Sequence, residues 1–565
     1  MLVRVITITL LMGLLWGCGR QTPDTSNTDT NKSLDYTKLQ LPEKPNILWL
    51  VAEDLSPHLP AFGDSTVVTP NLDRLAAQGV RYPNFFSPSG VCAPSRAAIA
   101  LGMYPTRTGA MHMRTGPWYA PNPDPPATWG ENRPVYEALP PAGTHMHSTY
   151  LRAAGYYATN NAKQDYQFRV ELTAWDESSR SAHWRNRPDA RQPFFSIFNF
   201  EVTHESRIWA KAQDSLWVPE NLEVPVPPYL PDTEVVRQDL RRMYSNILEM
   251  DRQLGEILDQ LEADGLLDNT IIFFYGDHGG PLPRSKRTLY DTGLRSPLIV
   301  RFPGGQMGGM EDPQLLSFLD LKPTLMSLAG TPSPANLDGR AWLGTYTDSN
   351  PRAYLHAAAD DFDGSSHGRL RAVRDQRYKY IRNYLPEKPS YNDVPYRKQM
   401  PSMQELLALK EEGQLDSIPM LWFGTQDNPE ALYDTWQDPF ELRNLIREPH
   451  LAGIRDTLRA EMDRWIAHTG DLGMMPETEY LTQIWPEGQQ PVTQPPTLSV
   501  TDGKITLTSP TQGTAIGYQW LAAGETPAAS WQVYQGPMPI EPGKKLVYRA
   551  HRIGYLPSVE VGREF

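Results

Sequence analysis

Cysteine is the scarcest residue of the sequence, with only Cys18 and Cys92 among 565 residues. Basic residues are too few to balance the acidic ones: 53 lysines and arginines face 66 aspartates and glutamates, a net charge of −13. This deficit argues against nucleic acid as a partner. After the N-terminal segment there is no apolar run that could span a membrane, and there are no internal repeats or charge blocks. What remains is a globular chain long enough for more than one domain, in which an anionic substrate would require particular lysines and arginines.

The N-terminus resembles an export signal. A single arginine precedes an apolar run that ends at Cys18 and is too short to cross a bilayer. The last four residues of this segment, LWGC, resemble a bacterial lipobox, in which the cysteine is lipidated; an ordinary signal peptide is the alternative. We therefore expect a signal peptide over 1–17, a disordered tether over 18–43, and an exported protein anchored by lipid to a bacterial membrane, at the cell surface or the periplasmic face. Lipid on Cys18 would leave Cys92 without a disulfide partner, which favours a reactive or modified thiol.

The rest of the chain alternates buried strands with amphipathic helices, as in an α/β protein. An unbroken apolar run over 47–52 predicts a buried parallel strand. A helix is predicted from Pro70 to a terminating Gly79, and a longer one over 236–261, where apolar residues recur every three or four positions. The segments FFSIFNF and TIIFFYG predict two further buried strands.

Polar residues follow each of these three strands. Glu53 and Asp54 follow the first, and Asp277 and His278 the last; the remaining strand ends near His204. Each acid pair alone could cap a helix or sit in a turn. Because ligands bind beyond the carboxyl ends of strands in open α/β sheets, we expect the three groups to converge. Clustered carboxylates favour a hard divalent cation such as Ca²⁺ or Mg²⁺, whereas zinc would require more histidine or cysteine.

Cys92 lies in a turn bounded by glycine and proline, within SGVCAPSRAAIALG, just before the predicted first turn of a helix. A cysteine and an arginine at a helix N-terminus could form a thiolate phosphatase, because the helix dipole and the guanidinium both lower the thiol pKa. That chemistry places five residues between the cysteine and the arginine. Here Arg96 follows after three, and Ala98 stands at the wider spacing, so the thiolate hypothesis fails.

The pentapeptide Cys92-Ala93-Pro94-Ser95-Arg96, followed by ALGMYPTRTG, resembles the signature of the formylglycine-dependent (type I) sulfatases. In that family a formylglycine-generating enzyme oxidises the cysteine to 3-oxoalanine (formylglycine), whose hydrate supplies the nucleophile. TPNLDRLAAQG, GDHG, SKRTLYDTGLRSPLIVRFPG and ALYDTWQDPFELRNL are similar to further family landmarks in family order, over about residues 44 to 470. NNAKQDY, FNFEVTHESR and AWDESSRSAHWRNR look closest to the sulfamidase-like branch, which acts on sulfated sugars. The resemblance implies an alkaline-phosphatase-like α/β fold.

The resemblance also implies one bound Ca²⁺ and a set of catalytic residues. Arg96 would hold the modified side chain, and His204 would protonate the leaving alkoxide. Lys286 matches the lysine before RTLY that contacts the sulfate, and Lys163 matches the lysine of the family's Gly-Lys-x-His segment. Outside this context each would be taken for a solvated surface lysine. Cations aimed at the bridging oxygen suit the reaction, because cleaving a sulfate ester builds negative charge there. The implied metal ligands are Glu53, Asp54, the modified Cys92, Asp277 and His278.

Two positions depart from the family pattern. The histidine of the family's Gly-Lys-x-His segment, normally the base that expels sulfate, is replaced by Asp165 in Asn161-Ala162-Lys163-Gln164-Asp165. Asp165 could serve as that base, or the role could move elsewhere. Glu53 stands where Asp is commoner, and its extra methylene weakens the case for it as a ligand.

The sequence texture changes after Glu487. QQPVTQPP predicts a stiff linker, and LSVTDGKITLTS, AIGYQWL and KLVYRAHRIGY predict strands of a small β-sandwich. Trp520 or Trp531 could bind sugar there, although such aromatic residues more often belong to the core. We therefore expect a sulfatase α/β domain, a smaller α+β C-terminal subdomain, a linker and a β-sandwich module, over residues 44–370, 371–482, 483–496 and 497–565.

The sequence thus predicts a formylglycine- and calcium-dependent sulfatase that removes sulfate groups from a sulfated polysaccharide or oligosaccharide. A phosphatase or phosphodiesterase of the same superfold is one alternative, but it would use a Ser or Thr nucleophile and usually two metals. A catalytically dead, glycan-binding surface lipoprotein is the other. That alternative does not explain why Arg96, His204, Lys286 and the acids occur together.

Overall fold

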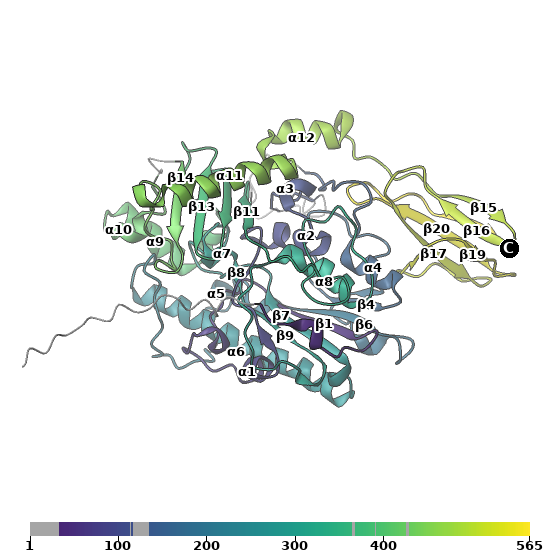
Figure 1. The fold of residues 1–565 in the computed structure, drawn as a ribbon, viewed down its shortest axis with the longest axis horizontal. Helices are drawn as coiled ribbons and strands as arrows, with labels where there is room; N and C mark the ends of the chain where they lie inside the picture. The colour runs from purple at the N-terminus through teal and green to yellow at the C-terminus, as the bar shows by residue number, and fades with distance from the viewer. Residues whose placement is uncertain (1–32, 114, 117–134, 364–367, 390, 425–428) are drawn as a thin grey trace, which may run out of the picture.

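The computed structural model describes residues 33–113, 115–116, 135–363, 368–389, 391–424 and 429–565. The predicted signal peptide, Cys18 and most of the predicted tether lie outside these residues. Figure 1 shows a central α/β body, a smaller sheet with helices at one end and a β module at the other. Within the described residues, no helix combines the length and the apolarity needed to cross a membrane.

A seven-stranded sheet forms the middle of the body, in the order β2-β9-β7-β1-β6-β4-β5. The strands from β7 to β5 run parallel, and β9 pairs antiparallel with β7. Both faces of a parallel sheet are covered, which is why its inner strands are apolar throughout. The strands are β1 (Asn46–Ala52), β2 (Val80–Arg81), β4 (Tyr157–Asn161), β5 (Glu177–Ser178), β6 (Phe194–Phe200), β7 (Thr270–Gly276) and β9 (Leu298–Arg301).

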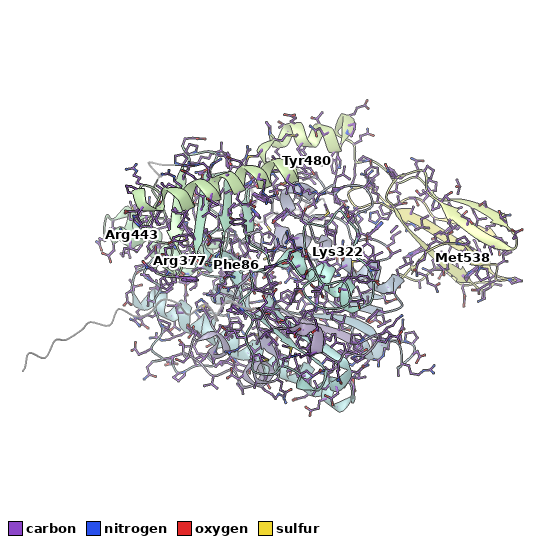
Figure 2. All side chains as sticks on the ribbon, viewed as in Figure 1. Phe86, Lys322, Arg377, Arg443, Tyr480 and Met538 are labelled. Carbon is purple, nitrogen blue, oxygen red and sulfur yellow. The ribbon has the colours of Figure 1, made fainter. Side chains whose placement is uncertain are left out.

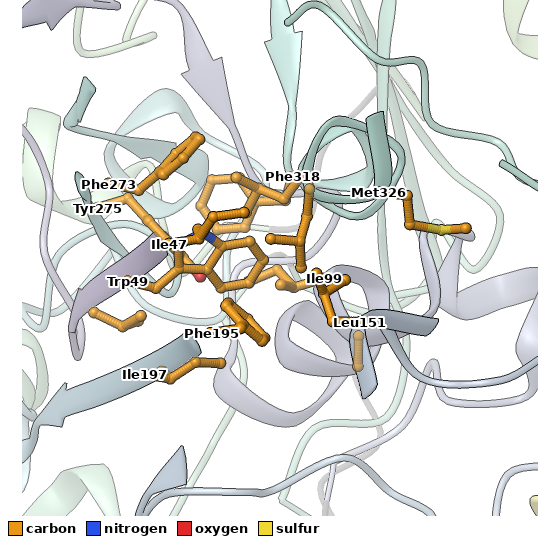
Figure 3. Packing of buried hydrophobic residues seen from close by; sticks show 14 of the residues in the cluster. Ile47, Trp49, Ile99, Leu151, Phe195, Ile197, Phe273, Tyr275, Phe318 and Met326 are labelled. Atoms are coloured by element: carbon orange, nitrogen blue, oxygen red, sulfur yellow. The ribbon is translucent and has the colours of Figure 1, made fainter. Parts of the chain in front are cut away.

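Alternate residues of β1 face two helical layers. Ile47, Trp49 and Val51 pack on the side of α2, α4 and α8, where Trp49 meets Phe195 edge-on at 5.0 Å between ring centroids (Figure 3). The intervening residues pack on the side of α1 and α6. The helices predicted from Pro70 and over 236–261 are confirmed. The helices of the body are α1 (Pro70–Ala77), α2 (Cys92–Leu101), α3 (Pro105–Thr108), α4 (His147–Ala153), α5 (Ser206–Ala210), α6 (Glu234–Ala263), α7 (Asp291–Leu294) and α8 (Leu321–Leu328).

A four-stranded antiparallel sheet forms the smaller subdomain, in the order β11-β12-β13-β14. One face packs over the start of α2, where Cys92 and Ala93 join its apolar cluster, and α11 covers the other face. Because β11 pairs with β12, this sheet begins at Leu355 and not at the predicted boundary of 371. Its elements are β11 (Leu355–Ala359), β12 (Leu370–Arg374), β13 (Tyr378–Asn383), β14 (Glu430–Asp434), α9 (Pro401–Glu411), α10 (Ser417–Met420), α11 (Ala452–Thr469) and α12 (Glu477–Ile484); β3 (Phe85–Phe86), β8 (Arg295–Ser296) and β10 (Leu316–Ser317) form a small separate sheet.

The C-terminal residues fold into two antiparallel sheets that share one core, as predicted for a β-sandwich. The predicted hairpin turns at Asp502 and Gly503, which both have positive φ angles of 50° and 71°. Met538 lies in this module (Figure 2). The strands are β15 (Thr497–Thr501), β16 (Lys504–Thr508), β17 (Ala515–Leu521), β18 (Gln532–Val533), β19 (Met538–Pro539), β20 (Lys545–His551) and β21 (Val561–Glu564).

The module is docked firmly on the body. Arg152 of α4 donates hydrogen bonds to the carbonyl oxygens of Thr173 and Trp531, at 2.7 and 2.8 Å, and pairs with Asp176. The Trp531 side chain is buried in a cluster that includes Leu172 of the body. Trp531 is therefore a core residue of the junction, not a sugar-binding one.

Two predicted boundaries differ from the structure. The tether was expected to reach residue 43, but Tyr36 donates a 2.7 Å hydrogen bond to Asp312 and packs on the body with its neighbours. The predicted linker over 483–496 is partly structured: α12 extends into it, and Val492 forms a β-bridge with Leu556. Apolar side chains within both polar stretches explain the difference, because each finds a surface to pack against.

Candidate active site

Cys92 is the first residue of α2 and is completely buried. Its sulfur lies 3.4 Å from Nε2 of His278 and 3.8 Å from Oδ1 of Asp54. The unpaired N–H groups at this end of α2 add partial positive charge, which favours an anion beside Cys92. The sequence correctly placed Cys92 at a helix start.

The acids that follow β1 and β7 lie together, as predicted from their positions after the two buried strands. Ala52 and Gly276 are paired in parallel register, so the next residues of both strands leave the sheet at one edge. The backbone N–H of Asp54 donates to Oδ1 of Asp277 over 2.9 Å. His204 reaches the same edge from β6 through a single 3-10 turn, η6 (Glu201–Thr203).

Two predicted cations balance the acids on one side of Cys92. Arg96, one turn along α2, contacts Asp277 at 2.9 Å and Glu53 at 3.5 Å. Lys163, in the loop after β4, lies 3.1 Å from Glu53 and 3.7 Å from Asp165. The structure therefore brings Asp165 to the site through its contact with Lys163.

Lys286 balances the acids on the other side. Its Nζ lies 2.8 and 2.7 Å from the two carboxylate oxygens of Asp54 and 3.1 Å from Nε2 of His204. A further carboxylate oxygen, from Glu205, lies 3.2 Å away. All four side chains are nearly or completely buried, so these interactions are little screened by water.

Four buried residues could hold a metal ion: Asp54, Cys92, Asp277 and His278 offer ligand atoms within 4.8 Å of one another. Two carboxylates and a ring nitrogen suit a divalent cation, and an oxygen in place of the Cys92 sulfur would make the set more suitable for a hard ion. Nδ1 of His278 is buried and has no hydrogen-bond partner among the described residues, so one ring nitrogen of this set is not committed to another protein group. The residues present therefore fit the predicted metal. Glu53 is not one of the four, because its carboxylate faces Lys163 and Arg96; as a ligand it stays a prediction.

Burial and charge shift several pKa values at the site. Burial alone would raise the pKa of Asp54, but Lys286 and two histidines hold it well below its ordinary value. At Glu53 the effect of burial on the pKa is larger than the opposing effect of the Lys163 and Arg96 charges, so the pKa is raised. Burial opposes a charge on His278, yet Asp277, Cys92 and Asp54 raise its pKa to about 10.

His204 behaves in the opposite way. Burial and the neighbouring Lys286 ammonium lower its pKa well below the ordinary value, so its ring is neutral and accepts a hydrogen bond from Lys286. To donate a proton, His204 must first gain one. The negative charge of a bound anion would favour that step.

Comparison with known proteins agrees with this geometry. A family model described as "Sulfatase" matches residues 45–331, and one described as "N-sulphoglucosamine sulphohydrolase, C-terminal" matches residues 279–418. An ulvan-active sulfatase of Formosa agariphila is 47% identical over 557 residues, covering 92% of this chain and 91% of the relative. The chain belongs to the sulfatase family.

Two more distant similarities support the architecture of this sulfatase. Human N-sulphoglucosamine sulphohydrolase is 24% identical over 476 residues, covering 75% of this chain and 90% of the relative. A solved structure in complex with its substrate D-glucosamine-2-N,6-O-disulfate matches with a TM-score of 0.55 and 17% identity, covering 76% of this chain and 98% of that one. The second similarity shows the fold alone.

The sulfatase site contains residues that the sequence did not single out. Glu205 accepts two hydrogen bonds from Arg287, at 2.9 and 2.6 Å, and its backbone N–H donates to Asp54 over 2.7 Å. The cations Arg287 and Lys286 lower the pKa of Glu205 to about 2, although burial opposes this. Glu205 therefore links Lys286 to Arg287, which also contacts Asp363. Its position next to His204 was the only sequence signal.

Asn199 is the second residue that was missed. Its amide oxygen accepts a 2.7 Å hydrogen bond from Arg96, and its amide nitrogen donates to Asn160 and to the carbonyl of Asn161, each over 3.1 Å. Asn160 in turn donates to the carbonyl oxygen of Lys163. This chain of amides connects Arg96 with the loop of Lys163 and sets their separation.

Replacing Glu205 by Gln should impair both stability and turnover. The change keeps the shape but leaves Lys286 and Arg287 without one buried carboxylate, which should lower the free energy of unfolding by about 3 kcal/mol. A less firmly held Lys286 should also reduce kcat roughly 10- to 100-fold. Denaturant unfolding and steady-state kinetics measure the two effects.

Glu461→Gln is the matched control for this change. Glu461 is also largely buried and pairs with His356 and Arg464, but it lies on α11, on the outer side of the subdomain sheet. The Glu461→Gln variant should be less stable than the wild-type protein and have the same kcat. If Glu205→Gln lost stability but turned over like Glu461→Gln, Glu205 would have no positioning role.

Proposed function

We propose that this sulfatase hydrolyses sulfate groups of a sulfated polysaccharide or oligosaccharide, of the kind represented by ulvan. The observation that carries the proposal is the gathering of Arg96, Lys163 and Lys286 around a buried cysteine in a protein of net charge −13. Such a concentration of cations suits a substrate that brings its own negative charge. The ulvan-active relative at 47% identity supports the glycan class.

Cys92 is the proposed nucleophile after conversion to formylglycine by a formylglycine-generating enzyme. In that form, position 92 supplies a hydrated aldehyde whose hydroxyl attacks sulfur. The position suits this role, because the side chain lies at the head of a helix, beside the carboxylates of Asp54 and Asp277 and the cations that pair with them. Arg96 and Asn199 hold the cationic side of this arrangement.

Ca²⁺ is the proposed metal, held by Asp54, Asp277, His278 and the modified Cys92, with Glu53 as a further candidate. When bound, the ion supplies positive charge that draws electrons from the sulfate and from the nucleophile. Lys163 and Lys286 would bind sulfate oxygens and neutralise charge that develops during cleavage. These two lysines flank Cys92 from the loops after β4 and β7.

Proton transfer falls to His204 and Asp165. His204 gains a proton beside the bound sulfate and gives it to the leaving alkoxide, while Lys286 orients its ring. Asp165 accepts a proton from the second hydroxyl of the hydrated side chain and so permits sulfate release. Its contact with Lys163, at 3.7 Å between Nζ and Oδ2, keeps it at the site.

The two-metal phosphatase alternative is less well supported. Asp54, His204 and Glu205 form a second group that could hold a cation, but the Lys286 ammonium lies within 2.7 to 3.2 Å of all three. A built-in cation there leaves room for one metal. A dead glycan-binding protein would have no need for this buried charge balance.

We also propose that the protein is exported and anchored to a bacterial membrane by lipid on Cys18.

Peptide mass spectrometry tests the nucleophile. Protein from its native host, or produced with a formylglycine-generating enzyme, should show Cys92 as formylglycine. Cys92→Ser should abolish turnover in a host that modifies only cysteine, because one hydroxyl cannot replace a hydrated aldehyde. Active enzyme that contains only the free thiol would refute the proposal.

Metal analysis tests the ion separately from activity. Elemental analysis of the wild-type protein should find one Ca²⁺ per chain. Asp277→Asn should lose this ion and at least about 100-fold in activity, because the ligand set loses an anionic oxygen. Asp189→Asn, at an exposed position that forms an ion pair with Arg191, should keep both. Full activity of metal-free wild-type protein in chelator would contradict the metal role.

Leaving-group dependence tests the proton-transfer roles. His204→Ala should slow the hydrolysis of sulfated sugars roughly 100-fold or more, because their alkoxides are poor leaving groups. It should slow the hydrolysis of activated aryl sulfates much less. Asp165→Asn keeps the shape and loses basicity. It should release alcohol at a normal rate in the first turnover and then turn over slowly, for both substrate types.

Rapid-mixing kinetics distinguish these outcomes. A burst of alcohol in Asp165→Asn, with no burst in His204→Ala, is the expected pattern. Equal losses in both variants, without a burst and without leaving-group dependence, would mean that both residues only position others.

A further inference from the structure

A partly exposed aromatic ring stands beside His204, and a second partly exposed ring packs against the first. Tyr396, next to the 3-10 turn η10 (Arg397–Gln399) of the smaller subdomain, has its ring centroid 6.5 Å from that of His204. Trp209 of α5 packs edge-on against Tyr396, with 5.2 Å between centroids. Two domains thus contribute one aromatic surface next to the proposed proton donor. A ring surface of this kind suits the apolar face of a sugar.

A pair of arginines shares one carboxylate, that of Glu201, three residues before His204. Arg180 and Arg207 each lie 3.7 Å from the same carboxylate oxygen of Glu201. Their side chains are 86% and 41% exposed, so both can reach a ligand. Two guanidinium groups share one carboxylate, which leaves a surplus positive charge in an acidic protein.

The backbone fixes this charge next to His204. The N–H of His204 donates to the carbonyl of Glu201 over 3.3 Å, and the N–H of Arg207 donates to the carbonyl of His204 over 2.8 Å. Glu201 and Arg207 therefore stand one turn before and one turn after the histidine. The loop of Arg180 is joined to the site through its carbonyl, which accepts a 2.8 Å hydrogen bond from Asn161.

We propose that Arg180, Arg207, Trp209 and Tyr396 form a subsite for a second anionic group of the glycan. The sulfated sugar packs on Tyr396 and Trp209, and a carboxylate or a second sulfate nearby pairs with Arg207 and Arg180. Arginine suits both groups, because its planar fork can donate two parallel hydrogen bonds to carboxylate or sulfate oxygens. The inference rests on the proposed function, since it takes the leaving oxygen to lie at His204.

The subsite explains how the enzyme could choose among sulfated glycans. In the proposed mechanism the residues around Cys92 act on the sulfate and on the bond being cleaved, which every sulfated sugar shares. Tyr396 comes from a different domain, and Arg180 from a loop with no other role at the site. Specificity is thus assigned to residues outside the catalytic group.

The test compares substrates that differ by one charge. The set is an activated aryl sulfate, a neutral oligosaccharide with one sulfate, the same with two sulfates, and a monosulfated oligosaccharide with a uronic acid before and after reduction of its carboxyl group. The variants are Arg180→Gln/Arg207→Gln and Tyr396→Ala. Arg191→Gln, at a 91% exposed arginine that pairs with Asp189, is the control.

In Arg180→Gln/Arg207→Gln, the ratio of kcat/KM for the dianionic glycan to that for aryl sulfate should fall about 10- to 100-fold, mainly through KM. If the carboxylate is the ligand, the loss should disappear on the carboxyl-reduced substrate. If the second sulfate is the ligand, the loss should appear on the disulfated glycan only. Tyr396→Ala should lower kcat/KM for every oligosaccharide relative to aryl sulfate.

Some results would overturn the subsite. One is an unchanged ratio of kcat/KM values for both dianionic glycans in Arg180→Gln/Arg207→Gln. The other is an equal loss of kcat/KM on all substrates in that variant, when it unfolds at the same denaturant concentration as the control. Failure of the proposed function would look different. Wild-type protein with formylglycine at position 92 would then desulfate neither aryl sulfate nor any glycan of the set.

Discussion

The charge balance around Asp54 is the constraint on which the site depends. A carboxylate in a dry interior is costly unless cations and hydrogen bonds compensate it. Lys286 contacts both oxygens of Asp54, and the N–H of Glu205 and the ring of His278 complete its surroundings. These partners come from the segments that follow β6 and β7. The buried charges at the end of β1 are therefore stable only when all of these partners are in place.

The fold delivers these segments through simple rules of sheet geometry. Parallel register aligns the ends of β6, β1 and β7, so the residues that follow each strand meet at one edge. α2 enters the same edge with Cys92 at its first position, and the subdomain sheet covers it with apolar side chains. Water is thereby excluded from Cys92 on one side. Cations and acids face it on the other.

Features that depend on residues close together in the chain were predicted more accurately than features that depend on residues far apart. The strand over 47–52, the helix over 236–261 and the hairpin at Asp502 were predictable, because apolar period and turn chemistry are local properties. The boundaries at 43, 371 and 496 were less accurate. Composition marked those stretches as polar, but whether a few apolar residues such as Tyr36 find a partner depends on a surface formed elsewhere.

The site shows the same division between what the sequence settled and what it could not. The sequence by itself determined that Cys92 begins a helix within a sulfatase motif, and that acids follow the buried strands. Only the tertiary structure decided that Glu205 joins Lys286 to Arg287, that Asn199 holds Arg96, and that Tyr396 stands beside His204. The physical reason is that a buried ion pair or a ring contact depends on distance in space. Arg287 lies 82 residues from Glu205 along the chain, and no local pattern records that they meet.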